Sequence, residues 1–423
     1  MVVEEKFEFT GKAKTSLVIT FVVGVILALI GVFLIGSGGH GHEAHEAAGH
    51  GAHHGGIGLR VIKNLWHNNV FFTGIAVIGI FFVAFNYVAW AGWSAAVKRV
   101  PEAFGYYLFF ALISTVVIFA LFHHELFHWW EPTLYEKGHE NYDPIIASKT
   151  WYLGKGFFTF RMVAYFVIWI GLWWILRTNS IKEDLEGGVK YHDSSVFWSA
   201  IFLIFWGVTS STSAWDWVMS VDPHFFSTMF GWYVFASWFV TGLAVITFTV
   251  VLLKENGYLP MVNENHLHDL GKFVFAFSVF WTYIWFCQFL LIYYANIPEE
   301  SYYFVERLKT DVYSPIFFMN IFINFFFPFL ALMTRNAKRQ RIILKIVCVA
   351  VFIGHWFDFY IMLTPPILRH EGGLDGNFFF LELGIALTFL SIFIFSLMFG
   401  LTKASLVAKN HPMLEESVHH HVY

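Results

Sequence analysis

The residues best able to do chemistry in this sequence are ionisable side chains placed within, or at the rims of, long apolar runs. His355 and Asp358 are three residues apart inside one such run, so any helix through it presents both on one face. Ionisable groups are costly in an apolar surrounding, and an imidazole and a desolvated carboxylate can both exchange protons near neutral pH. We therefore predict a proton-handling site at this pair.

Further polar groups follow the same pattern in other apolar runs. Asn320 and Asn324 are four residues apart in one run, and Arg161 lies about one turn inside another. The candidates for a proton pathway are Asn86, Tyr87, Glu125, Arg161, Asp216, Asp222, Asn320, Asn324, His355, Asp358 and Glu382. A quinone head presents two oxygens that need a hydrogen-bond donor and a proton acceptor, and the candidates for binding it are His123, His124, Arg161 and Asp216.

Several of these residues also have a structural interpretation. Arg161 could be a salt-bridge partner of Asp216 or Glu125 that holds helices together. The asparagines could hydrogen bond between helices, as polar residues in membrane bundles often do. The histidines from residue 123 to 128 could form a solvated helix end.

The elements that position these groups are predicted from composition and hydropathy. The 423 residues are 57% hydrophobic and 13% charged, with a mean hydropathy of +0.59, whereas a soluble domain carries about 25% charged residues. Apolar runs without period-two alternation fall near 16–36, 70–90, 104–122, 157–176, 195–214, 228–253, 272–294, 315–334, 344–363 and 378–401. Each can cross a bilayer as a helix, so we predict an all-α integral membrane protein with about ten transmembrane helices.

The orientation follows from the basic residues. Lysines and arginines gather on the side that carries the N-terminus, the even-numbered loops and the C-terminus, with a dense group between Met333 and Lys345. Because cytoplasmic loops carry an excess of such residues, both termini are predicted to be cytoplasmic in a multi-pass protein of a bacterial inner membrane. Residues 1–15 and 402–423 are then the cytoplasmic ends, and 37–69 a periplasmic loop. Its His- and Gly-rich part is a flexible segment or a metal-binding tract.

The sequence predicts no redox cofactor bound by this chain. Cys287 and Cys348 lie inside apolar runs and cannot form a four-thiolate site for an iron–sulfur cluster. The C-x-x-C-H motif that attaches c-type haem is absent from the sequence. Among the histidines, His355 alone is predicted deep inside a span, and a b-type haem needs facing ligands there. No metal site is assigned.

Three stretches carry a resemblance to a known family. They read Asn86-Tyr-Val-Ala-Trp-Ala-Gly-Trp-Ser, Ser213-Ala-Trp-Asp-Trp-Val-Met-Ser-Val-Asp-Pro-His and Gly354-His-Trp-Phe-Asp-Phe-Tyr. Over essentially its whole length the chain resembles the NrfD/PsrC-like membrane subunits of Alternative Complex III, a bacterial quinol:electron-acceptor oxidoreductase. The resemblance implies two four-helix bundles, residues 70–214 and 215–363, flanked by a first span over 16–36 and a last one within 364–401.

The resemblance also implies a division of labour. Quinol from the membrane pool is the substrate of the complex, while haem c and iron–sulfur clusters belong to partner subunits. The implied partners are an ActC-like membrane subunit, an iron–sulfur subunit, multihaem cytochrome c subunits, a terminal oxidase and lipids, without nucleic acid. The chain itself would supply a proton-translocation pathway and a second quinone pocket. Protons would travel between Asn86, Asn320 and Asn324 in the inner half of the membrane and Asp216, His355 and Asp358 in the outer half.

Two other classes of function compete with this hypothesis. One is a secondary transporter or channel, although its usual mark, a span interrupted at the middle of the membrane, is not evident in the sequence. The other is a structural anchor for peripheral electron carriers, in which the polar residues serve packing.

Overall fold

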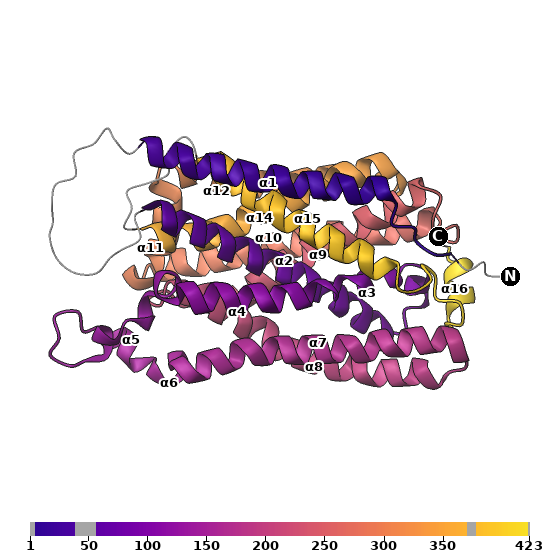
Figure 1. The fold of residues 1–423 in the computed structure, drawn as a ribbon, viewed down its shortest axis with the longest axis horizontal. Coiled ribbons are helices and arrows are strands. Elements are labelled where there is room, and N and C mark those ends of the chain that lie inside the picture. Colours follow the sequence, from indigo (N-terminus) through magenta and orange to yellow (C-terminus); the bar gives the residue numbers. More distant parts are fainter. Residues whose placement is uncertain (1–4, 39–55, 370–377, 422–423) are drawn as a thin grey trace.

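A computed structural model describes residues 5–38, 56–369 and 378–421 of the chain. Within these residues, ten helices are long and apolar enough to cross a membrane, and they run side by side along the long axis of the molecule (Figure 1). The regular elements described are all helical, and a single bridge between Lys6 and Ser405 is the one pairing of extended type among them. The prediction of an all-α protein with ten spans is confirmed.

The spans begin and end close to the predicted apolar runs. They are α1 (Gly11–Gly38), α2 (Gly56–Val88), α3 with α4 (Arg99–Phe104 and Tyr107–Leu126), α7 (Lys155–Glu186), α8 (Lys190–Trp217), α9 (Met229–Glu255), α10 (Glu264–Ala295), α12 with α13 (Tyr313–Ile321 and Phe327–Ala331), α14 (Arg341–Leu368) and α15 (Phe378–Leu401). Shorter helices cap the ends of the bundle, among them α5 (Pro144–Ser148), α6 (Thr150–Leu153), α11 (Pro298–Lys309) and α16 (Leu414–Val418). Large apolar side chains such as Phe160, Ile204 and Phe318 point outward, as lipid-facing residues do.

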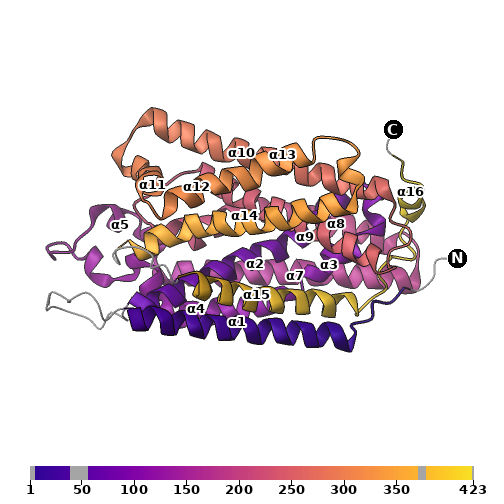
Figure 2. The same cartoon turned by 90° about the horizontal axis from the view of Figure 1, so that it is seen from above.

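The spans pack as two groups of four with a flanking pair. Helices α2, α4, α7 and α8 contact one another in the first group, and α9, α10, α12–α13 and α14 do so in the second. Helix α2 contacts α8, α9, α14 and α15, and 89% of its most apolar window is buried, so it forms the centre of the molecule. Helices α1 and α15 lie side by side at one edge (Figure 2).

Helix α2 begins much earlier than its apolar run indicates. It starts at Gly56, so residues 56–69, which the sequence placed in the loop, are helical. This segment is polar, yet Lys63, Asn64 and His67 are each 0% exposed. Hydropathy misses such a segment because its polar groups are satisfied by neighbouring helices and never meet lipid.

Both described ends of the chain lie at the same end of the bundle, as an even number of spans requires (Figure 1). They are tied together directly, because the backbone N–H of Leu406 donates to the carbonyl of Glu5 at 2.9 Å. The pair α1–α15 approaches closely at its glycines. A Cβ on Gly31 would lie 2.5 Å from the backbone nitrogen of Leu381, and one on Gly384 would lie 2.3 Å from that of Ala28.

The eighth span changes its winding near the middle. Residues Phe322–Phe326 form one π-helical turn between α12 and α13, just ahead of Pro328. Such turns are rare inside helices and occur frequently at functional sites. The turn contains Asn324, one of the predicted pathway residues.

Candidate functional site

One carboxylate on the last helix of the second group receives donors from the other three helices of that group. The side chain of Asp358, past the middle of α14, is 0% exposed. Its Oδ1 accepts from the hydroxyl of Tyr233 on α9 and from Nδ2 of Asn320 on α12, the latter at 2.8 Å. Its Oδ2 accepts from the indole N–H of Trp281 on α10 at 3.0 Å. All three donors are neutral. No arginine or lysine among the described residues is hydrogen bonded to this carboxylate.

His355 completes the centre of this site. Its Nδ1 lies 3.7 Å from Oδ2 of Asp358 and 2.9 Å from the hydroxyl of Ser237. The Nε2 atom is buried and has no hydrogen-bond partner in the described parts of the chain. The ring of Trp281 packs edge-on against the imidazole, with centroids 5.2 Å apart. The structure therefore places the two predicted residues side by side as a buried acid and imidazole.

A line of amide groups leads away from the carboxylate along the eighth span. Asn320 donates to Asp358, and its Oδ1 accepts from Nδ2 of Asn324 at 2.5 Å. The Oδ1 of Asn324 is buried and finds no further donor among the described residues. Gly354 makes room for this amide, because a Cβ at that position would lie 2.1 Å from Asn324 Oδ1. The two predicted asparagines and the predicted pair thus belong to one network.

A small cavity adjoins the network on the side of α11. It measures about 10 Å³, enough for about one water molecule, and Tyr233, Gln288, Tyr303, Arg307 and Asn320 contribute to its lining. The guanidinium of Arg307 is 1% exposed and donates to the carbonyls of Tyr303 and Ile361 at 2.6 and 3.1 Å. Burial raises the pKa of Tyr303 to about 12, so its phenol stays protonated at neutral pH.

A different arrangement holds the predicted carboxylate of the first group. Asp216 is 0% exposed and is paired bidentately with Arg161, whose Nε and Nη2 donate at 2.8 and 2.7 Å. The hydroxyl of Tyr165 adds a third bond at 2.7 Å. The guanidinium also donates to the carbonyl of Tyr152 and stacks 4.0 Å from the centroid of its ring. Of the two partners considered for Arg161, the structure shows Asp216, and the pair joins α7 to α8.

Two more predicted carboxylates are held by cations that the sequence did not single out. Glu382 on α15 pairs with Lys63 at 3.3 Å and accepts from Asn64 at 2.8 Å, both on α2. Asp222 accepts from Arg369 at 2.7 Å. Burial alone would lower the pKa of Arg369. Its hydrogen bonds to carboxylates and their negative charges, above all those of Asp222, instead raise this pKa above its ordinary value.

The predicted quinone-binding histidines lie at the end of α4. Nδ1 of His123 is 3.0 Å from the carbonyl of Phe119 on its own helix, and its ring packs against His124 and Trp130. His124 is exposed and Glu125 is half-buried. The bonds that the structure gives His123 are therefore local to this helix end, while Arg161 and Asp216 are bonded to each other.

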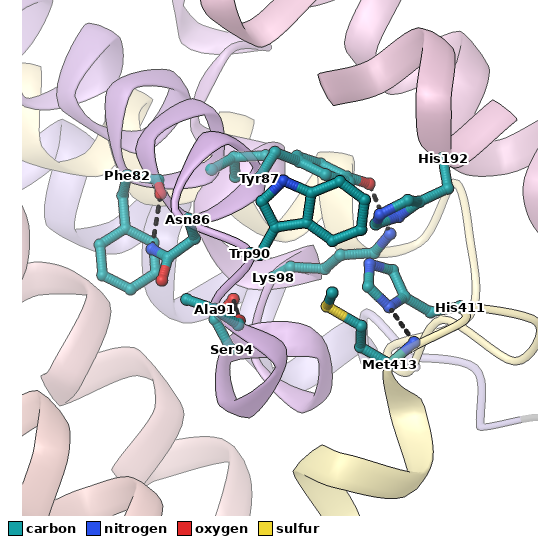
Figure 3. Close-up of a pocket in the computed structure, with 11 residues that line it drawn as sticks. Phe82, Asn86, Tyr87, Trp90, Ala91, Ser94, Lys98, His192, His411 and Met413 are labelled. Carbon is teal, nitrogen blue, oxygen red and sulfur yellow. Dashed lines mark hydrogen bonds between the residues drawn. The ribbon is translucent and has the colours of Figure 1, made fainter. Parts of the chain in front are cut away.

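Asn86 and Tyr87 lie at the other end of the bundle, near the chain termini. Both line a pocket with Lys98, His192 and His411 (Figure 3). The ammonium of Lys98 donates to Tyr87 at 2.8 Å, and Nδ2 of Asn86 donates to the carbonyl of Phe82 at 2.7 Å. These two predicted pathway residues thus belong to the first helix group, apart from the asparagine line of the second.

Sequence reasoning missed the residues that complete these sites. Tyr233 and Trp281 sit in apolar runs rich in aromatic residues, where nothing distinguishes a hydrogen-bonding ring from a packing one. Lys63 and Asn64 could have been found, because they directly precede the apolar run that begins at residue 70 and a helix through that run can extend back to include them. Arg307 has no such signal, because α11 reads as an ordinary polar helix.

Comparison of the sequence with protein-family models finds no match, and comparison with curated proteins finds none either. The functional conclusion therefore depends on the residues and their geometry.

Proposed function

We propose that this chain is an ActF-type integral membrane subunit of a respiratory quinol-oxidising complex, Alternative Complex III, and that its second helix group provides a proton pathway. The observation that carries the proposal is the centre at Asp358, a fully buried carboxylate that accepts hydrogen bonds from three other helices and lies beside a buried imidazole. Intramembrane ionisable residues facing a bundle interior typically mark ion or proton routes.

The geometry favours a transfer site over a static ion pair. The carboxylate of Asp358 can take up and release a proton while its neutral donors stay in place. A second group able to accept a proton lies beside it, the imidazole of His355, whose Nδ1 is 3.7 Å from Oδ2 of Asp358. By contrast, Asp216 is bonded to a guanidinium that does not titrate, which suits it to holding helices together.

The pathway that we propose has two arms. On one side the asparagine line runs from Asp358 to Asn324 in the π-helical turn, whose buried amide oxygen can accept from a water molecule. On the other side Tyr233 connects the carboxylate to the cavity below α11. Protons would move along these groups and intervening water, while electrons would pass through haem and iron–sulfur centres in partner subunits.

The decisive experiment replaces Asp358 by Asn in the assembled complex reconstituted into liposomes. Quinol oxidation and proton translocation are measured together, and we expect a loss of at least about tenfold in one of them, because a positioned proton-transfer group typically contributes 10²- to 10⁴-fold. Asp311→Asn, on an exposed loop before α12, is the matched control and should leave both unchanged.

A second variant separates loss of the proton site from loss of packing. In Asp358→Asn the new amide N–H would face the indole N–H of Trp281, which destabilises the centre. Adding Trp281→Phe removes that conflict, so the double variant should assemble normally and remain defective. Assembled complex with unchanged turnover and proton-to-electron ratio in both variants would refute the pathway.

Purification from native membranes in mild detergent tests the membership of the complex. Copurification of multihaem cytochrome and iron–sulfur subunits, identified by haem spectra and mass spectrometry, supports the proposal. A solitary, colourless protein that binds a solute would contradict it and favour a transporter.

A further inference from the structure

A second pocket lies outside the Asp358 centre, at the end of the bundle that carries the termini. It measures about 20 Å³ and is lined by residues of α2, α8 and the C-terminal segment (Figure 3). Its imidazoles are those of His192 and His411, and Glu183 lies against them. None of these three residues has a part in the proposed proton pathway.

The three residues offer a compact set of ligand atoms. One carboxylate oxygen of Glu183 and one ring nitrogen from each histidine all lie within 4.8 Å of one another. The residues are 1%, 4% and 8% exposed respectively, so water cannot satisfy them freely. Both ring nitrogens of His192, and Oε1 of Glu183, lack a hydrogen-bond partner among the residues that the structure describes. Buried polar atoms are rarely left this way without a ligand.

Three separate segments bring these groups together. Glu183 is in the last turn of α7, and His192 is in the first turn of α8. Gly187 and Gly188 join the two helices with positive φ angles of 69° and 77°, which turns the chain back so that the two side chains face each other. His411 comes from the segment after α15, which packs across this end of the bundle towards α16.

The two oxygens of Glu183 are used differently. Its Oε2 accepts from Lys98 at 2.9 Å, while Oε1 faces Nδ1 of His192 at 3.9 Å. Lys98 thereby orients the carboxylate, as outer groups commonly do for metal ligands, although its charge also lowers the affinity for a cation. The neighbouring arginines, Arg177 and Arg99, add no further uncompensated charge, because they pair with Glu102 and Asp184.

We propose that Glu183, His192 and His411 bind one divalent transition-metal ion, with Zn²⁺ the best match. Two imidazoles and one carboxylate are a common zinc ligand set and leave a fourth position open, here towards the pocket. Ligand atoms around such an ion stand about 3.4 Å apart, so the side chains must close slightly on binding. Nδ1 of His411 accepts from the backbone N–H of Met413 at 3.2 Å. An ion on this ring would break that bond, either by binding Nδ1 itself or by binding Nε2 and moving the ring proton to Nδ1.

Such a site would stabilise the packing of the C-terminal segment. A bound ion would fasten the C-terminal segment to the ends of α7 and α8 through His411. None of its three ligands belongs to the Asp358 centre, so this proposal stands or falls independently of the proton pathway.

The test must exclude the histidine-rich residues 40–54, which lie outside the described residues and could bind metal themselves. The full-length chain is therefore prepared with the histidines of that segment replaced by Gln. It is loaded with ZnCl₂, dialysed against a weak chelator, and analysed for bound metal by inductively coupled plasma mass spectrometry. We expect one equivalent of zinc per chain, and a loss of most of it in His192→Gln and in His411→Gln.

His224→Gln is the matched control, because His224 also contacts a carboxylate, Asp143 at 2.6 Å, at the opposite end of the bundle. It should keep the full equivalent. Binding of Co²⁺ to the parent chain, followed by its visible d–d bands, gives a measurement that needs no variant and should show four- or five-coordinate cobalt. Retention of zinc by both histidine variants, or a parent chain that binds neither ion, would overturn the proposal.

Discussion

The bidentate pair between Arg161 and Asp216 allows a quantitative prediction. In Asp216→Asn the guanidinium keeps its charge but faces a neutral amide, which leaves it one acceptor oxygen instead of two and turns the new N–H towards it. Breaking one partner of a buried pair costs about 3–5 kcal/mol. We expect the lower part of this range, about 3 kcal/mol, because Arg161 retains the carbonyl of Tyr152 at 2.9 Å and the ring beneath it.

The assay is reversible unfolding in mixed micelles of mild detergent and dodecyl sulfate, followed by tryptophan fluorescence. The matched control is Asp193→Asn, which makes the same substitution on the same helix at an exposed position and should change the free energy of unfolding by about 0.5 kcal/mol or less. The triple variant Arg161→Met, Asp216→Leu and Tyr165→Phe removes every member of the cluster. It should recover most of the lost stability, because a buried ion pair can often be replaced by apolar residues without loss.

Two outcomes would refute this reasoning. If Asp216→Asn unfolds within 1 kcal/mol of the parent, the pair is not a structural clamp. If the triple variant is less stable than Asp216→Asn alone, the ion pair contributes more than the cost of its desolvation, and the balance assumed here is wrong.

Three further perturbations follow from other contacts. Gly354→Ala would force the amide of Asn324 to move, so we expect a loss of about 1–3 kcal/mol in unfolding free energy together with impaired proton transfer. Lys63→Met leaves the buried carboxylate of Glu382 without its cation, and thermal unfolding should show a loss of about 3–5 kcal/mol. At Asp143 burial raises the pKa, but the hydrogen bonds that the carboxylate accepts outweigh burial and hold its pKa below the ordinary value. It therefore stabilises α5 above about pH 4 and loses this effect as the pH falls through the lowered value, which pulsed hydrogen exchange of α5 would detect.

Each of these has its own control. Gly171→Ala places the same methyl group in open space and should be neutral or slightly stabilising. Lys272→Met removes a half-exposed lysine from its pair with Asp269, which keeps its contact with His420, and should cost less than about 1 kcal/mol. Asp143→Asn keeps the helix cap without the titration, so the protection of α5, corrected for the intrinsic exchange rate at each pH, should no longer change over this pH range. Equal effects in any variant and its control would contradict the corresponding prediction.

The transmembrane architecture was largely predictable, because a span needs a continuous apolar run and lipid gives few alternatives to a helix. The first turns of α2 were not, because Lys63 and Asn64 are polar in sequence but enclosed by other helices in the fold. Hydropathy describes what a segment would meet if it faced lipid. A helix at the centre of a bundle faces only protein. Its polar side chains then depend on polar groups of the neighbouring helices, which hydropathy does not consider.

The candidate site was half predictable for a related reason. His355 with Asp358, and Asn320 with Asn324, carry helical spacing that a single sequence displays. Their outer partners come from helices far away in the chain. Tyr233 and Trp281 look like packing residues until the four helices are assembled. Glu183 and His411 are separated in the chain by α8, the whole second helix group and α15.

The glycine contacts between α1 and α15 impose an order on biosynthesis. Among the described spans, α1 is made before all the others, and it packs mainly against α15, which is made after them, through a seam where Gly31 and Gly384 bring the two backbones together. During translation α1 must therefore remain in the membrane without this partner until the spans between them have been made. Insertion of α15 also lets the backbone N–H of Leu406 hydrogen bond to the carbonyl of Glu5, which ties the two ends of the described chain together. A chain truncated before α15 would keep both helix groups but leave its first helix solitary in lipid, exposed to membrane quality control.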